Sequence, residues 1–398
     1  MRLAARAKNI GASPTLAMNA RATDMKRQGI DILSFTVGEP DFNTPEHIAA
    51  AGIDAIKTGF TRYTPAAGIP ELKEAICFKL KRDNGLVYEP ADIVVSNGAK
   101  HSIYNALQAL IEDGDEVIIP TPYWVSYTEM VKLNGGKPVI IPTTAEDGFK
   151  LTPEQLRAHV TDRTKAIFIN SPNNPTGAVY SRTELEQLAN ILVPRGVVII
   201  ADEVYEKLLY DGAVFTSAAA LGPEVKDLTV TINGVSKTYA MTGWRIGYAA
   251  APRALAKAMA NIQSHATSNP NSIAQKAAAV ALIGDQQPVA DMLTEFTRRR
   301  ERMVGLINDI PGLSCRKPEG AFYVFADASA LFGKSIRGQE IKGSVDLAEL
   351  LLTEAHVALV PGAAFGDDSF IRFSYATSLD VIEKGLARVK DVLAEAIG

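Results

Sequence analysis

Cysteine is scarce in this sequence, with only Cys77 and Cys315 among 398 residues. The two lie far apart and form no Cys-x-x-Cys pair, which argues against a disulfide framework and against a thiolate metal site. The five histidines form no His-Glu-x-x-His motif either. This cysteine usage is typical of a reducing compartment, so we expect a cytoplasmic protein.

Long apolar runs and an excess of basic residues are also missing. No segment approaches the roughly eighteen consecutive apolar residues of a membrane span, and no apolar stretch follows the three basic residues at positions 1–9. Lysine and arginine total 41 against 45 for aspartate and glutamate, so the chain offers no basic field for nucleic acid or an anionic membrane. We expect a soluble protein that has neither as a partner.

Apolar runs that alternate with helical stretches fill the centre of the chain. The pattern is typical of a mainly parallel, seven-stranded sheet covered by helices on both faces. The predicted strands are 93–96, 116–120, 138–142, 165–170, 197–201, 228–232 and 246–250. With 47% hydrophobic and 22% charged residues, the composition is that of an ordinary globular protein of two or three domains.

The flanking segments predict further helices and a second, smaller α/β unit. Ahead of the sheet we expect a helix at 16–28, a strand at 32–35, a helix at 45–57 capped by Thr44, and a helix at 70–82. Helical periodicity from 252 to about 308 predicts one long helix that leaves the sheet and marks a domain boundary. In the remainder, strands are predicted at 321–326, 357–360 and 370–374. We therefore divide the chain into a segment 1–45 that packs with the small domain, a large domain 46–285 and a small domain 286–398.

Lys237 stands in the stretch 233–245, Asn-Gly-Val-Ser-Lys-Thr-Tyr-Ala-Met-Thr-Gly-Trp-Arg, directly after a predicted buried strand. We expect Gly234 to break that strand. An amine among apolar neighbours and near a second cation can be neutral and nucleophilic near pH 7, and Arg245 supplies such a cation. Lys237 is therefore a candidate for chemistry through a Schiff base, with a surface lysine at a loop tip as the alternative.

Other strand-end loops carry unusual residues at the edge where open α/β sheets bind ligands. Gly98 and Ala99 lead directly into a helix, where free backbone N–H groups can hold a phosphate, although a glycine before a helix is commonly structural. Trp124 offers an aromatic face, although an aromatic residue there is commonly part of the core.

Asn174 and Asp202 stand at two further strand ends. Asn174 either makes hydrogen bonds within its turn or donates to a ligand oxygen. Asp202 ends a very apolar strand, and a carboxylate there needs a cationic partner such as a protonated pyridine nitrogen. Tyr205 could bond a phenolic ring oxygen. Together these residues supply what pyridoxal phosphate requires: an imine-forming lysine, an acid at the ring nitrogen, donors, a stacking face and a phosphate cup.

Four motifs make the chain similar to the fold-type I, aspartate-aminotransferase family. They are Ser-Pro-Asn-Asn-Pro-Thr-Gly at 171–177, Asp-Glu-Val-Tyr at 202–205, Ser-Lys-Thr-Tyr-Ala-Met-Thr-Gly-Trp-Arg at 236–245 and Arg-Phe-Ser-Tyr at 372–375. They occur in the family's order and at similar spacing, and the resemblance covers nearly the whole chain. It implies a pyridoxal-phosphate enzyme that is a homodimer with active sites at the subunit interface.

The resemblance also implies the roles of individual residues. Lys237 corresponds to the Schiff-base lysine and proton shuttle, Asp202 to the partner of the pyridine nitrogen, and Arg372 to the arginine that takes the substrate α-carboxylate in a bidentate fork. The remaining cofactor contacts are Asn174 and Tyr205 at the ring hydroxyl, Trp124 on the ring face, Gly98, Ala99 and Arg245 at the phosphate, and Tyr63, which reaches the phosphate of the partner subunit. Lys100 and Ser236 are further cofactor contacts. The loop of Gly38 is expected to close over the substrate.

Two departures separate the sequence from the animal and enterobacterial enzymes. Gly234 replaces a phosphate-binding serine, and segment 265–270 lacks the arginine for the distal carboxylate. The sequence instead resembles the bacterial branch of Thermus-type enzymes, in which a lysine at the position of Lys100, with hydroxyls near Ser13 and Thr15, serves acidic substrates. Some members of that branch also accept prephenate.

The sequence thus predicts an aminotransferase that interconverts aspartate and 2-oxoglutarate with oxaloacetate and glutamate. The alternatives among enzymes are a transaminase for prephenate, aromatic amino acids or alanine, and a lyase with the same cofactor. A non-catalytic regulator of this fold is an alternative from another class. It would need a DNA-binding extension, and Gly38 follows too closely on the N-terminus for one.

Overall fold

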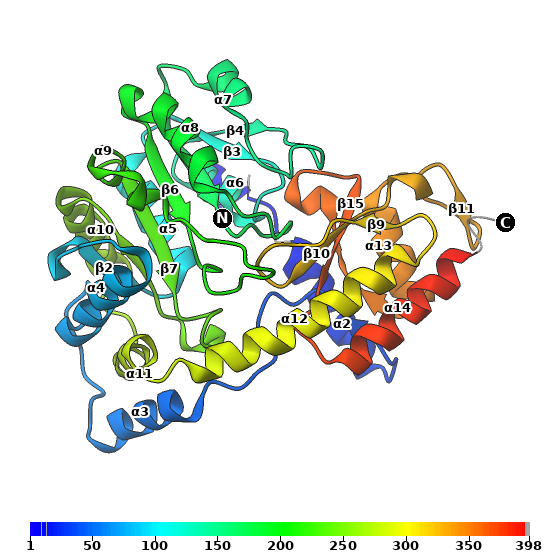
Figure 1. The fold of residues 1–398 in the computed structure, drawn as a ribbon, viewed down its shortest axis with the longest axis horizontal. Coiled ribbons are helices and arrows are strands. Elements are labelled where there is room, and N and C mark those ends of the chain that lie inside the picture. The colour runs from blue at the N-terminus through cyan, green and yellow to red at the C-terminus, as the bar shows by residue number, and fades with distance from the viewer. Residues whose placement is uncertain (9, 13, 395–398) are drawn as a thin grey trace.

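The computed structural model describes residues 1–8, 10–12 and 14–394 of the chain. Two lobes lie side by side, and the long helix α12 (Gln287–Asn308) runs from one to the other (Figure 1). The larger lobe contains the central sheet, and the smaller one contains the C-terminal strands and helices. Within the described residues, no helix is long and apolar enough to cross a membrane.

Seven strands form the sheet of the larger lobe. In spatial order they are β2 (Ile93–Ser96), β8 (Gly247–Ala250), β7 (Thr229–Gly234), β6 (Val198–Asp202), β5 (Thr164–Asn170), β3 (Glu116–Pro120) and β4 (Lys137–Ile141). Neighbours are parallel, except that β8 runs antiparallel to both β2 and β7. The inner strands are buried almost throughout, as sheets covered on both faces require. The predicted mainly parallel, seven-stranded sheet is confirmed.

Helices cover both faces of this sheet because successive strand residues point to opposite sides. Val117 and Ile119 pack in one core cluster with residues of α5 (Ala99–Leu110), α6 (Ser126–Leu133) and α10 (Arg253–Ala266). Ile118, between them, packs in a second cluster with residues of α7 (Pro153–His159) and α8 (Arg182–Leu192). A third cluster joins Ile93 and Val95 of β2 to α4 (Pro70–Asn84) and α11 (Ser272–Ile283).

The prediction of one long helix from 252 to 308 is wrong. The segment forms three helices, α10, α11 and α12, separated by two turns. Asn271 caps α11 by accepting a hydrogen bond from the Ala274 N–H at 2.9 Å, and Pro288 stands in the first turn of α12. These capping residues start new helices although the apolar periodicity continues across the turns.

The predicted cap at Thr44 is also wrong. Thr44 does not cap α3 (Glu46–Lys57), because its hydroxyl donates to the Ala240 carbonyl at 2.9 Å and accepts from the Trp244 indole N–H at 3.0 Å. Gly234 is the last residue of β7, so the strand ends there as predicted. A Cβ at this position would lie 3.0 Å from the Gly247 Cα, so the glycine also permits close pairing with β8.

The smaller lobe is built on a four-stranded antiparallel sheet. Its order is β14 (Val360–Pro361), β15 (Phe370–Ser374), β10 (Tyr323–Asp327) and β9 (Ser314–Cys315), covered by α13 (Ser344–Glu354) and α14 (Leu379–Leu393). The predicted strand 357–360 is divided in two, because β13 (Val357–Ala358) leaves this sheet to pair with β1 (Leu33–Ser34).

The remaining α-helices and strands of the described chain, in both lobes, are α1 (Ala5–Lys8), α2 (Pro14–Arg27), α9 (Pro223–Lys226), β11 (Ser335–Ile336) and β12 (Gln339–Glu340).

The N-terminal segment contacts the smaller lobe at several points. β1 pairs with β13 in parallel, the Phe35 N–H donates to the Ala358 carbonyl at 2.7 Å, and Arg388 forms an ion pair with Asp31. We propose that residues 1–45 belong with the small domain 286–398, and that the large domain comprises 46–285. The turn between α11 and α12 supports the second boundary.

Gly247 offers a direct test of how the sheet supports α5. A Cβ on Gly247 would lie 2.1 Å from the Ala99 nitrogen, so Gly247→Ala should destabilise the protein by about 2–3 kcal/mol through overpacking against backbone. Gly305→Ala in α12 is the control, because no described atom outside the backbone of its own helix lies within 4 Å of its Cβ position. This variant should be more stable than the wild type by about 0.5–1 kcal/mol. Urea unfolding of both variants measures the two changes, and equal behaviour would contradict the packing argument.

Candidate active site

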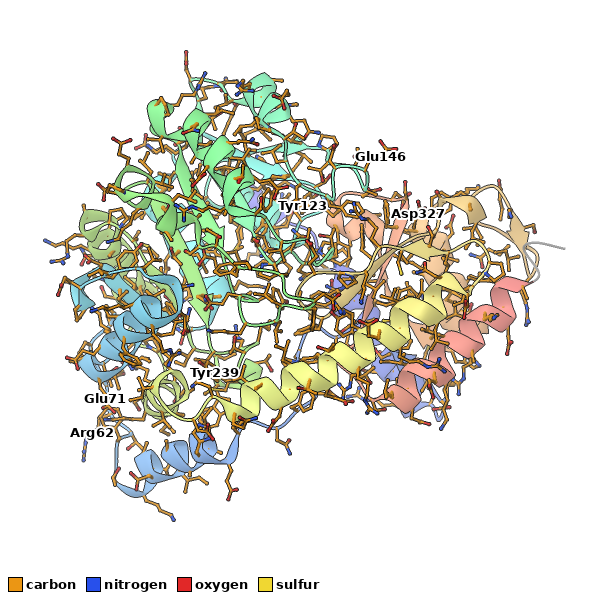
Figure 2. The ribbon with its side chains drawn as sticks, viewed as in Figure 1. Arg62, Glu71, Tyr123, Glu146, Tyr239 and Asp327 are labelled. Carbon is orange, nitrogen blue, oxygen red and sulfur yellow. The ribbon has the colours of Figure 1, made fainter. Side chains whose placement is uncertain are left out.

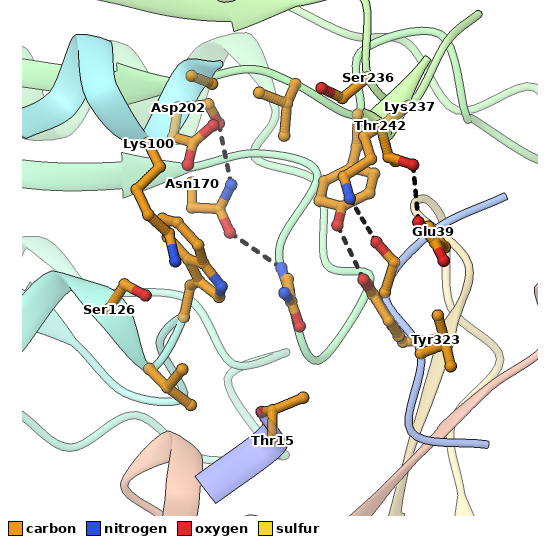
Figure 3. A pocket seen from close by; sticks show the side chains of 18 of the residues that line it. Thr15, Glu39, Lys100, Ser126, Asn170, Asp202, Ser236, Lys237, Thr242 and Tyr323 are labelled. Carbon is orange, nitrogen blue, oxygen red and sulfur yellow. Dashed lines mark hydrogen bonds between the residues drawn. The ribbon is translucent and has the colours of Figure 1, made fainter. Parts of the chain in front are cut away.

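A cavity of about 400 Å³ opens where the carboxyl ends of the central strands face the smaller lobe (Figure 3). It receives side chains from the N-terminal segment, the large sheet and the C-terminal strands. Twelve of the residues predicted from sequence line it: Thr15, Gly38, Ala99, Lys100, Trp124, Asn174, Asp202, Tyr205, Ser236, Lys237, Arg245 and Arg372. Residues from segments far apart in the chain therefore meet at one site.

Lys237 lies in the turn that follows β7, and its amine donates a hydrogen bond to the Gly38 carbonyl. Burial lowers the pKa of Lys237 to about 8, with the nearby Glu39 carboxylate opposing that effect and Arg245 adding to it. A substantial fraction of the amine is thus neutral at slightly alkaline pH. This is the state in which a lysine acts as a nucleophile or a base.

Asp202 ends β6 with its carboxylate buried at the cavity wall. Its Oδ2 accepts a hydrogen bond from the Tyr127 hydroxyl at 2.6 Å, and its Oδ1 has no hydrogen-bond partner among the described residues. Burial raises the pKa of Asp202 to about 6, and the bond from Tyr127 partly offsets the rise. Above that pH the Asp202 carboxylate is ionised, and its unpartnered Oδ1 can accept a hydrogen bond from a cationic N–H donor.

Arg372, on β15, brings a buried guanidinium to the opposite side of the site. Its Nη1 donates to the Asn174 Oδ1 at 2.9 Å and its Nη2 to the Thr36 carbonyl at 2.8 Å, while its Nε lacks a partner within the described chain. The guanidinium carbon lies 4.4 Å from the centre of the Tyr323 ring. The arginine is therefore fixed in orientation and keeps donor capacity for an anion.

Two aromatic contacts shape the remaining walls. The hydroxyls of Tyr205 and Tyr323 lie 2.9 Å apart, both on buried side chains. Across the cavity, the Lys100 amine lies 4.8 Å from the centre of the Trp124 ring, at the site of a cation–π contact. Lys100 is an exposed residue that still lines the cavity, and burial of its amine lowers its pKa.

Gly98, Ala99 and Arg245 lie together at the start of α5, and we call this group the cup. Gly98 is the N-cap of this helix with φ of 85°, and a Cβ there would lie 2.3 Å from Arg245 Nη2. The guanidinium is held by a bond from Nη1 to the Thr242 carbonyl at 2.9 Å. The first N–H groups of a helix have no acceptor within the helix, so this cup presents backbone donors beside a cation, as an anion site requires.

Three predicted residues stand apart from the cavity wall. Gly98 does not occur among the described lining residues, although it lies against Arg245, which does. Tyr63 is 91% exposed, and it does not occur among the described residues that line the cavity of its own chain. Ser13 lies outside the described residues, while its neighbour Thr15 reaches the cavity from α2.

Several site residues were missed by sequence reasoning. Tyr127, which bonds Asp202, comes from α6 and resembles an ordinary apolar helix position in the sequence. Thr36 contributes only its backbone carbonyl, which leaves no side-chain signal. Glu39 accepts from the Thr242 hydroxyl at 2.7 Å beside Lys237 (Figure 3), and its place next to Gly38 was the one available hint.

Comparison with known proteins identifies the family. The family described as aminotransferase class I and II matches residues 30–389. The chain belongs to this family. Its fold-type I architecture, with a large mainly parallel sheet and a smaller α/β unit, agrees with that assignment, and the predicted resemblance is confirmed.

Three relatives illustrate where in the family the chain lies. An aspartate aminotransferase from Geobacillus stearothermophilus is 50% identical over 98% of both chains. An aspartate/prephenate aminotransferase from Cereibacter sphaeroides is 50% identical over 95% of each. The solved structure of the Thermus thermophilus aspartate aminotransferase with maleate is 43% identical, with a TM-score of 0.93 over 99% of this chain and 100% of that one. The chain thus lies in the Thermus-type branch.

The buried carboxyl group of Glu203, behind the site, should make the stability of the protein depend on pH. Its Oε1 accepts from the Ser217 hydroxyl at 2.8 Å and the Ala218 N–H at 3.1 Å, whereas its Oε2 has no partner in the described part of the chain. Burial, and then repulsion by Glu206, raise the pKa of Glu203 to about 8. In the unfolded chain a glutamate ionises near pH 4.3, so between these two values the folded state holds an extra proton.

Stability should therefore fall as pH rises through this window, because the folded state binds more protons than the unfolded one. Glu203→Gln removes this titration. The free energy of unfolding of the variant, relative to that of the wild type, should therefore be about 2 kcal/mol higher at pH 7.5 than at pH 5.5. Urea unfolding at the two pH values measures this gain. A difference between the proteins that stays constant with pH would show that Glu203 is ionised in the folded state.

Proposed function

We propose that this protein is an aspartate aminotransferase that uses pyridoxal phosphate to interconvert L-aspartate and 2-oxoglutarate with oxaloacetate and L-glutamate. The observation that carries the proposal is the convergence of Lys237, Asp202 and Arg372 on one cavity, with a base, an unsatisfied acid and a fixed carboxylate receptor. The names of the Geobacillus and Thermus relatives support the choice of aspartate.

The residues of the cavity fit the cofactor. The unpartnered Oδ1 of Asp202 suits a protonated ring nitrogen, and no other cation of the described residues bonds to it. The cup of Gly98, Ala99 and Arg245 suits the phosphate, because any side chain at Gly98 would displace the guanidinium. In this proposal Trp124 covers the ring, Asn174 and Tyr205 approach the ring hydroxyl, and Ser236 and Lys100 complete the surroundings.

Pyridoxal phosphate, when bound, draws electrons away from the substrate α-carbon through its protonated ring. Asp202 keeps that ring protonated, because its buried carboxylate has no other cationic partner for Oδ1 in the described structure. Lys237 takes the proton from the α-carbon and returns it during transfer, and its pKa of about 8 suits a base that must also act as an acid. The Gly38 carbonyl orients this amine at the wall.

Arg372 and Lys100 explain how a dicarboxylate would be held. The guanidinium of Arg372, fixed by Asn174 and Thr36, binds the α-carboxylate common to all amino-acid substrates. The amine of Lys100, above the Trp124 ring, lies on the cavity wall with Thr15 and supplies the cation for the distal carboxylate. A lysine is a flexible point charge and accepts acids of different length.

Prephenate is a second candidate substrate for the same site. Two observations favour it: the Cereibacter relative carries that activity in its name, and the distal cation here is a flexible lysine and not a planar fork. The proposed reaction is otherwise unchanged, since the amino group is transferred at the same α-carbon.

A homodimer would complete this site. Tyr63 is 91% exposed in its own chain, and its neighbour Arg62 stands at the outer edge of the molecule beside α3 (Figure 2). We place Tyr63 at the phosphate of the partner subunit, as the resemblance implies. The expected cytoplasmic location agrees with the two free cysteines, Cys77 and Cys315.

A half-reaction tests the proposed function directly. The purified enzyme, loaded with pyridoxal phosphate, is mixed with single amino acids, and the absorbance of the bound cofactor is followed. Aspartate and glutamate should convert it rapidly, and prephenate should reverse the change if the second candidate holds. Conversion by phenylalanine or alanine but not by aspartate would reject the aspartate assignment.

Lys237→Ala should abolish covalent attachment of the cofactor and lower kcat by at least about a thousandfold, since the variant loses both nucleophile and base. Borohydride treatment followed by mass spectrometry measures the attachment, independently of activity. If the reduced variant still carried the cofactor mass, another lysine would hold that role.

Lys100→Ser should lower kcat/KM for aspartate and glutamate by about tenfold or more, the scale of one charge-assisted hydrogen bond, and leave the phenylalanine half-reaction nearly unchanged. Arg372→Lys is the matched comparison, because it alters the receptor of the α-carboxylate and should weaken every substrate. Equal losses for acidic and apolar substrates in Lys100→Ser would assign Lys100 to the cofactor or the fold.

A further inference from the structure

A buried ion pair lies behind the active site, on the side of the sheet covered by α4. Lys79 and Glu206 are ion-paired with only 3% of each side chain exposed. Glu206 directly follows Tyr205 in the chain, yet it does not occur among the described residues that line the cavity. The mechanism above therefore uses neither member of the pair.

The Glu206 carboxylate joins two elements that carry site residues. Its Oε1 accepts from Lys79 and also from the Asn233 amide at 2.8 Å, and the Asn233 Oδ1 in turn accepts from the Gly234 N–H at 2.7 Å. Asn233 stands in β7, four residues before Lys237. One carboxylate thus connects the turn of Tyr205 with the strand end that leads to Lys237.

The second oxygen of Glu206 points away from that strand. Its Oε2 accepts from the Asn84 amide at 2.7 Å, and Asn84 Oδ1 accepts from Lys79 at 2.8 Å. Asp83, 3.8 Å from the Lys79 amine, adds a second carboxylate on the α4 side. The Glu206 carboxylate therefore accepts hydrogen bonds from both β7 and α4. Only the bond from Asn233, in β7, connects it to the strand that leads to Lys237.

Stability alone does not explain why a lysine and a glutamate are buried here. Desolvation of two charges costs about as much as their attraction returns, and apolar pairs of similar volume are commonly as stable. What a satisfied buried network adds is a unique geometry, because each donor and acceptor fits only one arrangement. At this place the geometry that is fixed is the position of Lys237 relative to Tyr205.

We propose that Glu206, ion-paired with Lys79, is a positioning residue that sets the Lys237 loop against the Tyr205 turn through its hydrogen bond to Asn233. The inference rests on the proposed function, since it concerns how Lys237 meets the substrate. Small displacements of a reacting group cost large factors in rate, so the network should affect kcat more than substrate binding.

The chain offers a matched pair of variants. Asn233→Ala removes two bonds on the side that leads to Lys237, one to Glu206 and one from the Gly234 N–H. Asn84→Ala removes two bonds of similar length on the far side of the same ion pair. In the holoenzyme, Asn233→Ala should lower kcat for aspartate about tenfold or more with KM changed by less than about threefold. Asn84→Ala should keep kcat within about twofold, although it also loses two hydrogen bonds.

The visible circular dichroism of the bound cofactor, recorded without substrate, supplies a readout other than activity. Its band should change in Asn233→Ala and stay as in the wild type in Asn84→Ala. If Asn233→Ala does not fold, Glu206→Gln replaces it, because the amide keeps the side-chain volume and one acceptor oxygen while the charge is lost.

Equal loss of kcat in the two asparagine variants, or reduced thermal stability with unchanged kcat and dichroism, would assign the network to stability and overturn the proposal. The wild-type half-reaction is measured first and tests the proposed function by itself. Failure of the wild type to convert aspartate therefore counts against the function, and failure of the variants to differ counts against the positioning role.

Discussion

Charge held away from water is the constraint on which this active site depends. Asp202 and Arg372 are buried, and the Lys237 amine is largely removed from solvent, yet no two of them form an ion pair in the described structure. Each is satisfied only in part by neutral groups: the Tyr127 hydroxyl, the Asn174 and Thr36 oxygens, and the Gly38 carbonyl. Neutral partners orient a charge without cancelling it, so each keeps capacity for a ligand.

The fold makes such partial satisfaction possible because every charged group comes from a different rigid element. Asp202 ends β6, Lys237 follows β7, and Arg372 lies within β15 of the smaller lobe. The N-terminal segment passes between the lobes and gives backbone carbonyls to Lys237 and Arg372 together. A change in the distance between the lobes would therefore be felt by both residues through one short stretch of chain.

Apolar patterning made most of the fold predictable, and motif spacing made most of the site predictable. All seven strands of the large sheet were expected within about two residues, because buried parallel strands are continuous apolar runs between helical stretches. Helix ends were harder: Thr44 has the chemistry of a cap, but a tertiary contact with Trp244 takes its hydroxyl. Partners such as Thr36, which act through backbone carbonyls, leave no trace in side-chain identity.

Tyr127 was missed in the sequence for a more general reason. Its ring stacks on Phe168 with centroids 4.1 Å apart, and its hydroxyl reaches Asp202, so one side chain is both core and site. Helical periodicity reports only the core half of that role. The sequence is also uninformative about Glu206 and Lys79. Charged residues are usually exposed to solvent, but these two are buried behind the reaction centre. Residues that orient catalytic groups from behind follow the packing of the fold, and only a three-dimensional structure separates them from ordinary core and surface.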